Sequence, residues 1–154
     1  MRRLFAVAWT IWALDFVTKA WALSSLAPEP KKILGTFLQF TLIKNSGAAF
    51  NFATGFSLLF ALVAVVVVVG VSYFAPRITS AGWLTAMGLL LGGVLGNLTD
   101  RIFRSPGFFN GHVIDWIQIP HWPVFNLADS AISIAALLAF ILTLRNVPPI
   151  ARVK

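Results

Sequence analysis

The stretch "VFNLADSAISIAALLAFILTL", from Val124 to Leu144, decides the fold because it is long and apolar enough to cross a membrane as one helix. Such a helix needs about 20 mostly apolar residues to cross about 30 Å of hydrocarbon. The stretch contains a single charged residue, Asp129, near its start. A second acidic residue, Asp115, lies fourteen residues earlier in "HVIDWIQI" and also has apolar neighbours. The sequence therefore raises the question whether these two carboxyl groups belong to one site.

The composition is that of an integral membrane protein. Hydrophobic residues make up 58% of the 154 residues and charged residues only 11%, with a mean hydropathy of +0.85; soluble domains carry about 25% charged residues. The chain has twelve basic and five acidic residues. Because the basic residues do not form a block of five or more, they are better suited to contact with anionic lipid headgroups than to nucleic-acid binding. The absence of Cys excludes disulfides, thiol catalysis and Cys-ligated zinc. We expect residues 1–154 to form a single domain.

Four segments are predicted to span the membrane, at about 4–26, 56–75, 78–99 and 124–144. The valine-rich run in the second could be a buried strand, because β-branched residues favour sheets. Its uncharged length exceeds the usual 3–10 residues of a strand, so a helix is predicted. The first segment could instead be a cleavable signal peptide, but Asp15 and Lys19 interrupt its apolar region and favour a span.

Four spans place both termini on one side of the membrane and the connections 27–55 and 104–123 on the other. The first connection includes "ILGTFLQFTLI", whose β-forming residues predict a strand on the membrane surface. The second contains two Gly and three Pro and is predicted to be turn-rich. Basic residues divide evenly between the sides, so the positive-inside rule alone leaves the orientation open. Pairing of Lys19 and Arg101 with acidic neighbours would favour cytoplasmic termini.

Charged side chains inside a membrane cost at least about 2.5–3.5 kcal/mol each on insertion scales, so they need a partner or a task. Asp15 and Lys19 are four residues apart and are predicted to form a helix ion pair. Asp100 and Arg101 are expected to end the third span at the interface. Arg101 shares a helix face with Asn97, and together they make a donor-rich edge suited to backbone carbonyls.

Asp115 and Asp129 have no Lys or Arg within one helical turn. They could be two interfacial carboxylates that face water. However, the chain returns to the membrane at Asn126, one turn before Asp129, and can bring both carboxyl groups to the same depth, where they would share one proton. Such a pair is the arrangement of aspartic proteases, in which one carboxylate activates water and the protonated partner polarises the scissile carbonyl.

Two other patterns have simpler explanations. Gly88, Gly92 and Gly96 recur at intervals of four, which predicts a face for close helix packing. His112 and His121 lie in a Gly- and Pro-rich stretch without an evident third ligand, so we interpret them as surface residues and predict no metal site.

Four stretches in this order resemble bacterial lipoprotein signal peptidase (signal peptidase II), and together they cover most of the chain. They are "DFVTK" at Asp15–Lys19, "KNSGAAF" at Lys44–Phe50, "GNLTDR" at Gly96–Arg101 and "VIDW…VFNLADSAI" from Val113 to Ile132. The resemblance implies an all-α transmembrane four-helix bundle with a small extracytoplasmic β-cradle. It also implies an intramembrane aspartic endopeptidase of the bacterial inner (cytoplasmic) membrane. Such an enzyme removes the signal peptide from diacylglyceryl prolipoproteins, just before the lipidated Cys.

Carried over by motif, the resemblance makes Asp115 and Asp129 the catalytic residues. It implies two further groups: a substrate site of Asn45, Gly47, Asn97, Arg101 and Asn126, and structural charges at Asp15, Lys19 and Asp100. It also implies a monomer in contact with membrane lipid, without cofactor, metal or nucleic acid, and inhibition by a cyclic peptide antibiotic such as globomycin. Two departures from the family pattern are Asn51, where Ser is common, and the compact crossing between the two aspartates.

Two other classes of protein also place charges in membranes. A proton- or ion-coupled transport subunit would have acids near mid-span on several helices, whereas Asp115 and Asp129 lie at span edges on one side. If the chain were only a structural or assembly partner of another protein, the presence of Asp129 in an apolar segment would have no explanation. Both alternatives are less favoured than a peptidase.

Overall fold

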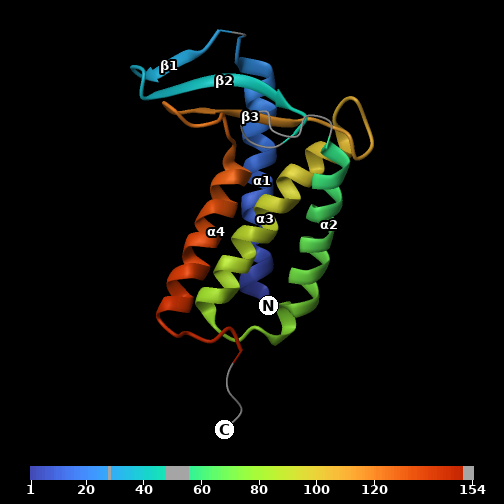
Figure 1. The fold of residues 1–154 in the computed structure, drawn as a ribbon, viewed down its shortest axis with the longest axis vertical. Coiled ribbons are helices and arrows are strands. Elements are labelled where there is room, and N and C mark those ends of the chain that lie inside the picture. The colour runs from blue at the N-terminus through green and yellow to red at the C-terminus, as the bar shows by residue number, and fades with distance from the viewer. Residues whose placement is uncertain (28, 48–55, 151–154) are drawn as a thin grey trace.

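A computed structural model describes residues 1–27, 29–47 and 56–150. In these residues the chain forms four α-helices, a short 3-10 turn and a three-stranded antiparallel sheet (Figure 1). In chain order they are α1 (Arg2–Ser25), β1 (Lys31–Leu34), β2 (Leu38–Asn45), α2 (Ser57–Phe74), η2 (Ala75–Arg77), α3 (Ala81–Phe103), β3 (Val113–Gln118) and α4 (Leu127–Leu144). All four helices are long and apolar enough to cross a membrane. The predicted membrane bundle with a small sheet is therefore confirmed.

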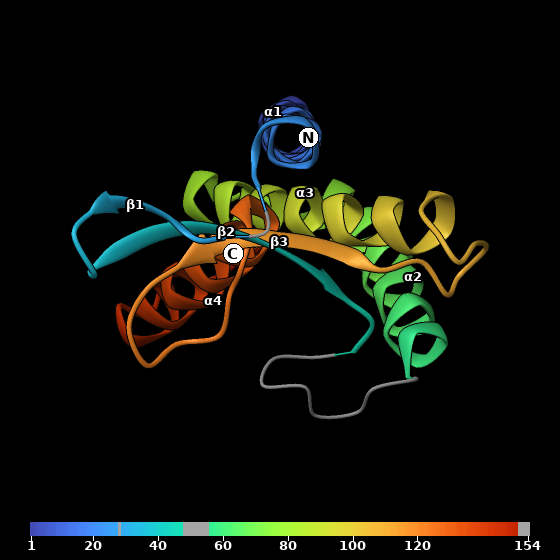
Figure 2. The same cartoon turned by 90° about the horizontal axis from the view of Figure 1, so that it is seen from above.

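The sheet covers one end of the bundle, and the N-terminus and the C-terminal end of α4 lie at the other end (Figure 1). Figure 2 shows α3 in the middle, with α1 on one side and α2 and α4 on the other. Glycines permit this close packing, because a Cβ at Gly88 would lie 2.7 Å from the Leu4 carbonyl oxygen and one at Gly92 would lie 2.6 Å from that of Ala8. Gly93 faces α4 in the same way. The predicted glycine packing face is confirmed.

The valine-rich run forms helix α2, so the alternative of a buried strand is excluded. Only Ser57 and Ala61 of this helix are buried. The remaining surface is mostly apolar and suits contact with lipid tails, because a helix satisfies its own backbone hydrogen bonds.

Helix α3 continues beyond the predicted end of the third span and runs to Phe103. Asp100 and Arg101 were expected to end this span at an interface where charges cost little. The position of the membrane boundary stays a prediction, but both residues lie within the last turn of the helix and are only 2% and 7% exposed. A charged residue does not end a helix when folding gives its side chain a partner, and both side chains have partners here.

The sheet has the order β1-β2-β3, with both pairs antiparallel. Strands β1 and β2 confirm the strand predicted in the first long connection. The second connection was predicted from its residues to be turn-rich, and it contributes β3, whose Asp115 pairs with Ile43 of β2. This partner lies far away in the sequence, so local turn signals could not reveal the strand.

An aromatic cluster fixes the sheet to the bundle. The rings of Trp21 on α1, Phe40 on β2 and Trp116 on β3 meet edge to face, with centroids 5.0–5.7 Å apart. This geometry is favourable for aromatic pairs. The cluster therefore holds β3, and with it Asp115, at a fixed height above the helices.

Candidate active site

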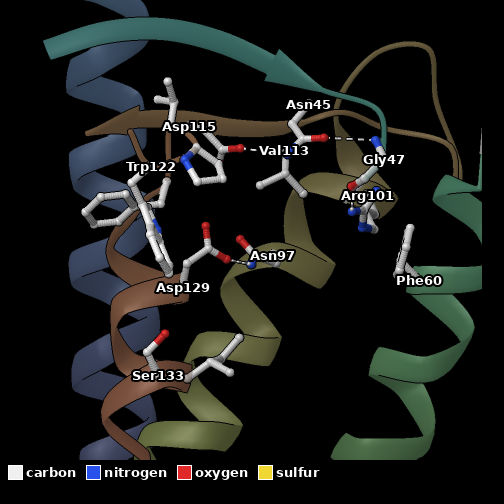
Figure 3. Close-up of a pocket in the computed structure, with 14 residues that line it drawn as sticks. Asn45, Gly47, Phe60, Asn97, Arg101, Val113, Asp115, Trp122, Asp129 and Ser133 are labelled. Carbon is white, nitrogen blue, oxygen red and sulfur yellow. Dashed lines mark hydrogen bonds between the residues drawn. The ribbon is translucent and has the colours of Figure 1, made fainter. Parts of the chain in front are cut away.

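Asp115 on β3 and Asp129 in the first turn of α4 line one cavity of about 330 Å³. Figure 3 shows the Asp129 carboxyl group directed upward from α4, toward the strand that carries Asp115. We call these two residues the aspartate pair. Four of the other predicted site residues also line this cavity, namely Asn45, Gly47, Asn97 and Arg101.

The start of α4 positions Asp129 and ties it to Asp115. Asn126 is the N-cap residue, and its side-chain oxygen accepts a hydrogen bond from the backbone N–H of Asp129 at 2.9 Å. The Asp129 carboxylate in turn accepts from the backbone N–H of Asn126 at 3.2 Å, which completes a capping box. The Asn126 amide nitrogen then donates to Asp115 Oδ1 at 2.6 Å. One local helix-start motif thus joins both members of the aspartate pair.

Asn45 at the end of β2 supports the other oxygen of Asp115. Its side-chain oxygen accepts from the backbone N–H of Gly47 at 2.9 Å, and its amide nitrogen donates to Asp115 Oδ2 at 2.8 Å. A backbone N–H can only donate, so the amide oxygen must face Gly47 and the NH₂ group must face the carboxyl group.

The hydrogen-bond partners of Asn97 on α3 fix the orientation of its side-chain amide in the same way. Its side-chain oxygen accepts from Lys19 Nζ at 2.9 Å, and its amide nitrogen donates to Asp129 Oδ1 at 2.8 Å. Because an ammonium group has no acceptor, the Asn97 NH₂ group is directed at the carboxyl group. Neutral amide groups therefore contact both members of the aspartate pair.

The surroundings of Asp115 make its proton available near neutral pH. Its carboxyl group is only 2% exposed. Burial, and to a smaller extent the charge of Asp129, raise the pKa of Asp115 to about 7, while hydrogen bonds from Asn45 and Asn126 limit the increase. Two neighbouring carboxyl groups, one of which exchanges a proton near pH 7, can act as a general acid and a general base.

Arg101 organises the opposite wall of the cavity. It donates to Ser57 Oγ at 2.8 Å and to the Gly47 carbonyl oxygen at 3.0 Å, and the Ser57 hydroxyl donates to the Gly111 carbonyl oxygen. The expectation that Arg101 suits backbone carbonyls is confirmed for Gly47. The membrane orientation expected from the sequence depended in part on a pair between Arg101 and an acidic neighbour such as Asp100. Arg101 does not form this pair, because helix packing directs its guanidinium group toward the start of α2 instead.

Asp15, Lys19 and Asp100 form a buried group that we call the ionic cluster. Lys19 Nζ lies 2.7 Å from Asp15 Oδ2 and 2.8 Å from Asp100 Oδ2. Arg104 also pairs with Asp100. The predicted Asp15–Lys19 ion pair is confirmed. The ionic cluster does not line the cavity but reaches it through Asn97.

Among the cavity-lining residues that the sequence did not indicate are Phe60, Trp122 and Ser133. Ser133 lies one helical turn after Asp129, and this spacing could have indicated it. Nothing in the sequence near Trp122 or Phe60 indicates a role in the site. Asn51 lies outside the described residues. Within the described ranges no group of three or more metal-binding side chains occurs.

Comparisons with known proteins agree with this geometry. A family model described as "Signal peptidase (SPase) II" matches residues 7–145. The chain is 44% identical over 145 residues to the lipoprotein signal peptidase of Mycobacterium avium (strain 104), covering 94% of this chain and 80% of that protein. It is 47% identical over 147 residues to that of Streptomyces coelicolor, with coverages of 95% and 72%.

A solved structure described as a bacterial membrane enzyme, at 2.3 Å resolution, matches the fold with a TM-score of 0.84. The match has 26% sequence identity and covers 100% of this chain and 96% of that one. A family match over most of the sequence, a shared membrane fold and a carboxyl pair in one cavity lead to one conclusion. The chain belongs to the signal peptidase II family of aspartic proteases.

Proposed function

We propose that this chain removes the signal peptide from diacylglyceryl-modified prolipoproteins and cleaves just before the lipidated Cys, with Asp115 and Asp129 as catalytic residues. The observation that carries the proposal is the cavity in which both carboxyl groups are held by amide donors instead of by Lys or Arg. This environment leaves a proton free to move between carboxyl group, water and substrate.

In the proposed mechanism the Asp129 carboxylate takes a proton from water while the water oxygen attacks the scissile carbonyl carbon. Asp115 starts protonated, consistent with its pKa of about 7, and donates its proton to the carbonyl oxygen. A neutral tetrahedral diol forms. Asp129 then gives its proton to the leaving Cys nitrogen, and Asp115 takes one from the diol as the C–N bond breaks. The aspartate pair ends with one proton, as it began, and the mechanism is metal-independent.

The contacts of the proposed substrate-site residues suggest different tasks for each. Both ends of the Asn97 amide are engaged within the protein, so we assign it to the support of Asp129. Asn45 and Asn126 support Asp115 in the same way. Arg101 uses donors on Ser57 and Gly47, and its remaining N–H groups are available for a peptide carbonyl.

An apolar groove next to the aspartate pair suits the acyl chains or the apolar signal-peptide residues of the substrate. It has a volume of about 210 Å³, lies among α2, α3 and α4, and shares Phe60, Asn97, Arg101 and Ile132 with the cavity. Its other walls are Val, Ala and Leu side chains. Burial of acyl or signal-peptide CH₂ groups there, worth about 0.8 kcal/mol each, would help to hold the scissile bond at the aspartate pair.

The distribution of charge supports cytoplasmic termini in a bacterial cytoplasmic (inner) membrane. The end of the bundle away from the sheet carries the exposed residues Arg2, Arg3, Arg77 and Arg145 (Figure 1), and the sequence places no acid near them. At the other end Lys19 is neutralised within the ionic cluster. The sheet end keeps the exposed residues Lys31, Lys32 and Lys44. The four exposed Arg residues therefore give the terminal end a small excess of positive charge, which supports it as the cytoplasmic one, with the sheet and cavity outside.

Three further expectations remain part of the proposal. The chain acts as a monomeric single domain surrounded by membrane lipid. A cyclic peptide antibiotic such as globomycin inhibits it by occupying the cavity between the aspartate pair and Arg101, because a peptide ring offers carbonyl groups to the same donors as a substrate.

The test compares a diacylglyceryl-modified precursor peptide with its unlipidated form, using protein purified in lipid. Wild type should cleave the lipidated peptide much faster, whereas Asp115→Asn and Asp129→Asn should cleave neither. Glu29→Gln, which changes an exposed acid outside the cavity, serves as the matched control and should behave as wild type. Substantial cleavage by either aspartate variant would refute the proposal, as would equal cleavage of both peptides.

A further inference from the structure

The carboxylates of the ionic cluster are tied to the backbone that carries the aspartate pair. Asp15 Oδ1 accepts from the backbone N–H of Ala128 at 2.9 Å, and Asp100 Oδ2 accepts from that of Ile114 at 3.2 Å. Each of these N–H groups belongs to the residue immediately before one member of the aspartate pair. The two ties come from different helices, α1 and α3, and end on different elements, α4 and β3.

Lys19 joins these ties at a single atom. Its Nζ contacts both carboxylates, at 2.7 and 2.8 Å, and also donates to the Asn97 side-chain oxygen at 2.9 Å. An ammonium group has three donors and no acceptor, so these partners match its full capacity. The Asn126 amide nitrogen also donates to this Asn97 oxygen, at the longer distance of 3.2 Å, so both contacts direct the Asn97 NH₂ group toward Asp129.

We propose that Lys19 is a positioning residue for the aspartate pair. It turns the Asn97 amide so that the NH₂ group faces Asp129, and it holds the two carboxylates that fix the backbone before each catalytic residue. Without the ammonium group the Asn97 oxygen keeps only the longer hydrogen bond from Asn126, and a rotated amide would present its oxygen to the Asp129 carboxylate, which would repel it. This inference rests on the proposed function and adds a residue that does not contact substrate.

Arg104 offers a matched comparison for Lys19. Both cations pair with Asp100, but the Arg104 side chain is 24% exposed, whereas that of Lys19 is 1% exposed. Only Lys19 reaches Asn97. A role limited to neutralising Asp100 would therefore be shared by both residues, and a positioning role would belong to Lys19 alone.

The experiment measures kcat and KM for the lipidated peptide with Lys19→Met and Arg104→Met variants in lipid. Residues that orient a catalytic group typically cost about 10- to 100-fold in activity when changed. We expect such a loss in kcat for Lys19→Met with little change in KM, because Lys19 does not line the cavity. Arg104→Met should stay close to wild type. Equal losses in both variants, or a loss confined to KM, would overturn the proposal.

Lys19→Met leaves two buried carboxylates with less positive charge and can impair folding. The double variant Lys19→Met/Asp15→Asn removes one charge of each sign, and Asn at position 15 still offers an oxygen to the Ala128 N–H. Its folding is checked by thermal unfolding in detergent. The folded double variant should keep the kcat defect; wild-type kcat in it would refute the positioning role.

Coupling to Asn97 separates positioning from an independent effect. If Lys19 acts through Asn97, adding Asn97→Ala to Lys19→Met should lower kcat little further, whereas independent effects would multiply. Multiplication of the two losses would overturn the inference. The proposed function is tested separately by Asp115→Asn and Asp129→Asn: if these are inactive and Lys19→Met is fully active, only the positioning role fails.

Discussion

The aspartate pair and the ionic cluster place the same type of side chain in contrasting surroundings. Burial alone does not separate them, because Asp15 is 0% exposed and both Asp100 and Asp115 are 2% exposed, although Asp129 is only half-buried. The partners do. The carboxylates of the ionic cluster contact an ammonium group, while those of the aspartate pair contact neutral amides.

The chemistry of the partner decides what a buried carboxylate can do. A cation beside a carboxylate favours its charged form. An amide donor holds the carboxyl group in place but supplies no compensating charge, so a proton can be taken up and released. Intramembrane acids therefore divide into structural and reactive groups by their neighbours, and four experiments test this division.

The largest effect on activity is expected for Asp129→Asn, and Asp15→Asn in the ionic cluster is the comparison. The Asp129 variant should lose about 10³-fold or more of its activity, because a catalytic carboxyl group is removed. Its stability should change by less than about 1 kcal/mol, since Asn preserves the shape and can still accept a hydrogen bond. Cleavage assays and thermal unfolding measure the two quantities. The reverse pattern, with lost stability and retained activity, would remove the distinction between the two sites.

Asp15→Ala tests the structural side of the comparison. Removing one partner of a buried ion pair typically costs about 3–5 kcal/mol, and this change also leaves the Ala128 N–H without its acceptor. Chemical unfolding in detergent should show a loss of this size. The exposed Glu29→Ala should change stability by less than about 0.5 kcal/mol. Similar small effects from both would show that the ionic cluster contributes little to stability.

Gly96→Ala tests how tightly the ionic cluster is packed. A Cβ at Gly96 would collide with the Asp15 carboxylate and lie 3.2 Å from Ala128 Cβ, so we expect a loss of about 1–3 kcal/mol. Gly70→Ala on α2 is the control, since nothing lies within 4 Å of its added Cβ. That variant should be neutral or more stable, because Ala favours helix over Gly. Thermal unfolding of both variants gives the comparison. Equal stability would show that the space around the ionic cluster accommodates an added methyl group.

The smallest effect concerns pH. The mechanism needs protonated Asp115, whose pKa is about 7, so kcat/KM should fall as pH rises through this value. The Asn45 hydrogen bond lowers the pKa of Asp115. Asn45→Ala should therefore move the falling limb of the pH profile to higher pH. A limb that stays in place or moves to lower pH would contradict the assignment of the proton to Asp115.

The parts of the molecule that local sequence determines could be predicted. Hydropathy over a helix length identifies the spans, and the spacing of Asp15 and Lys19 predicts their ion pair because both lie on one helix. The start of α4 is similar, since Asn126 and Asp129 form a capping box within four residues. These features depend on neighbours along the chain.

Features that depend on packing between distant segments could not be predicted. Lys19 meets Asp100 only because α1 and α3 approach closely, and Arg101 finds Ser57 only where α2 begins. The strand that holds Asp115 needs Ile43 as its partner. No local pattern gives the order in which such elements are packed, so the second partner of Lys19 and those of Arg101 emerged from the structure alone.

The amide of Asn126 has a consequence for the timing of enzyme maturation. It caps the last helix and also grips Asp115, so the reactive centre requires the final membrane segment to be wound and inserted. A nascent chain that has threaded only its first three helices lacks both Asp129 and this grip. The proposed catalytic site is therefore incomplete until α4 is in place.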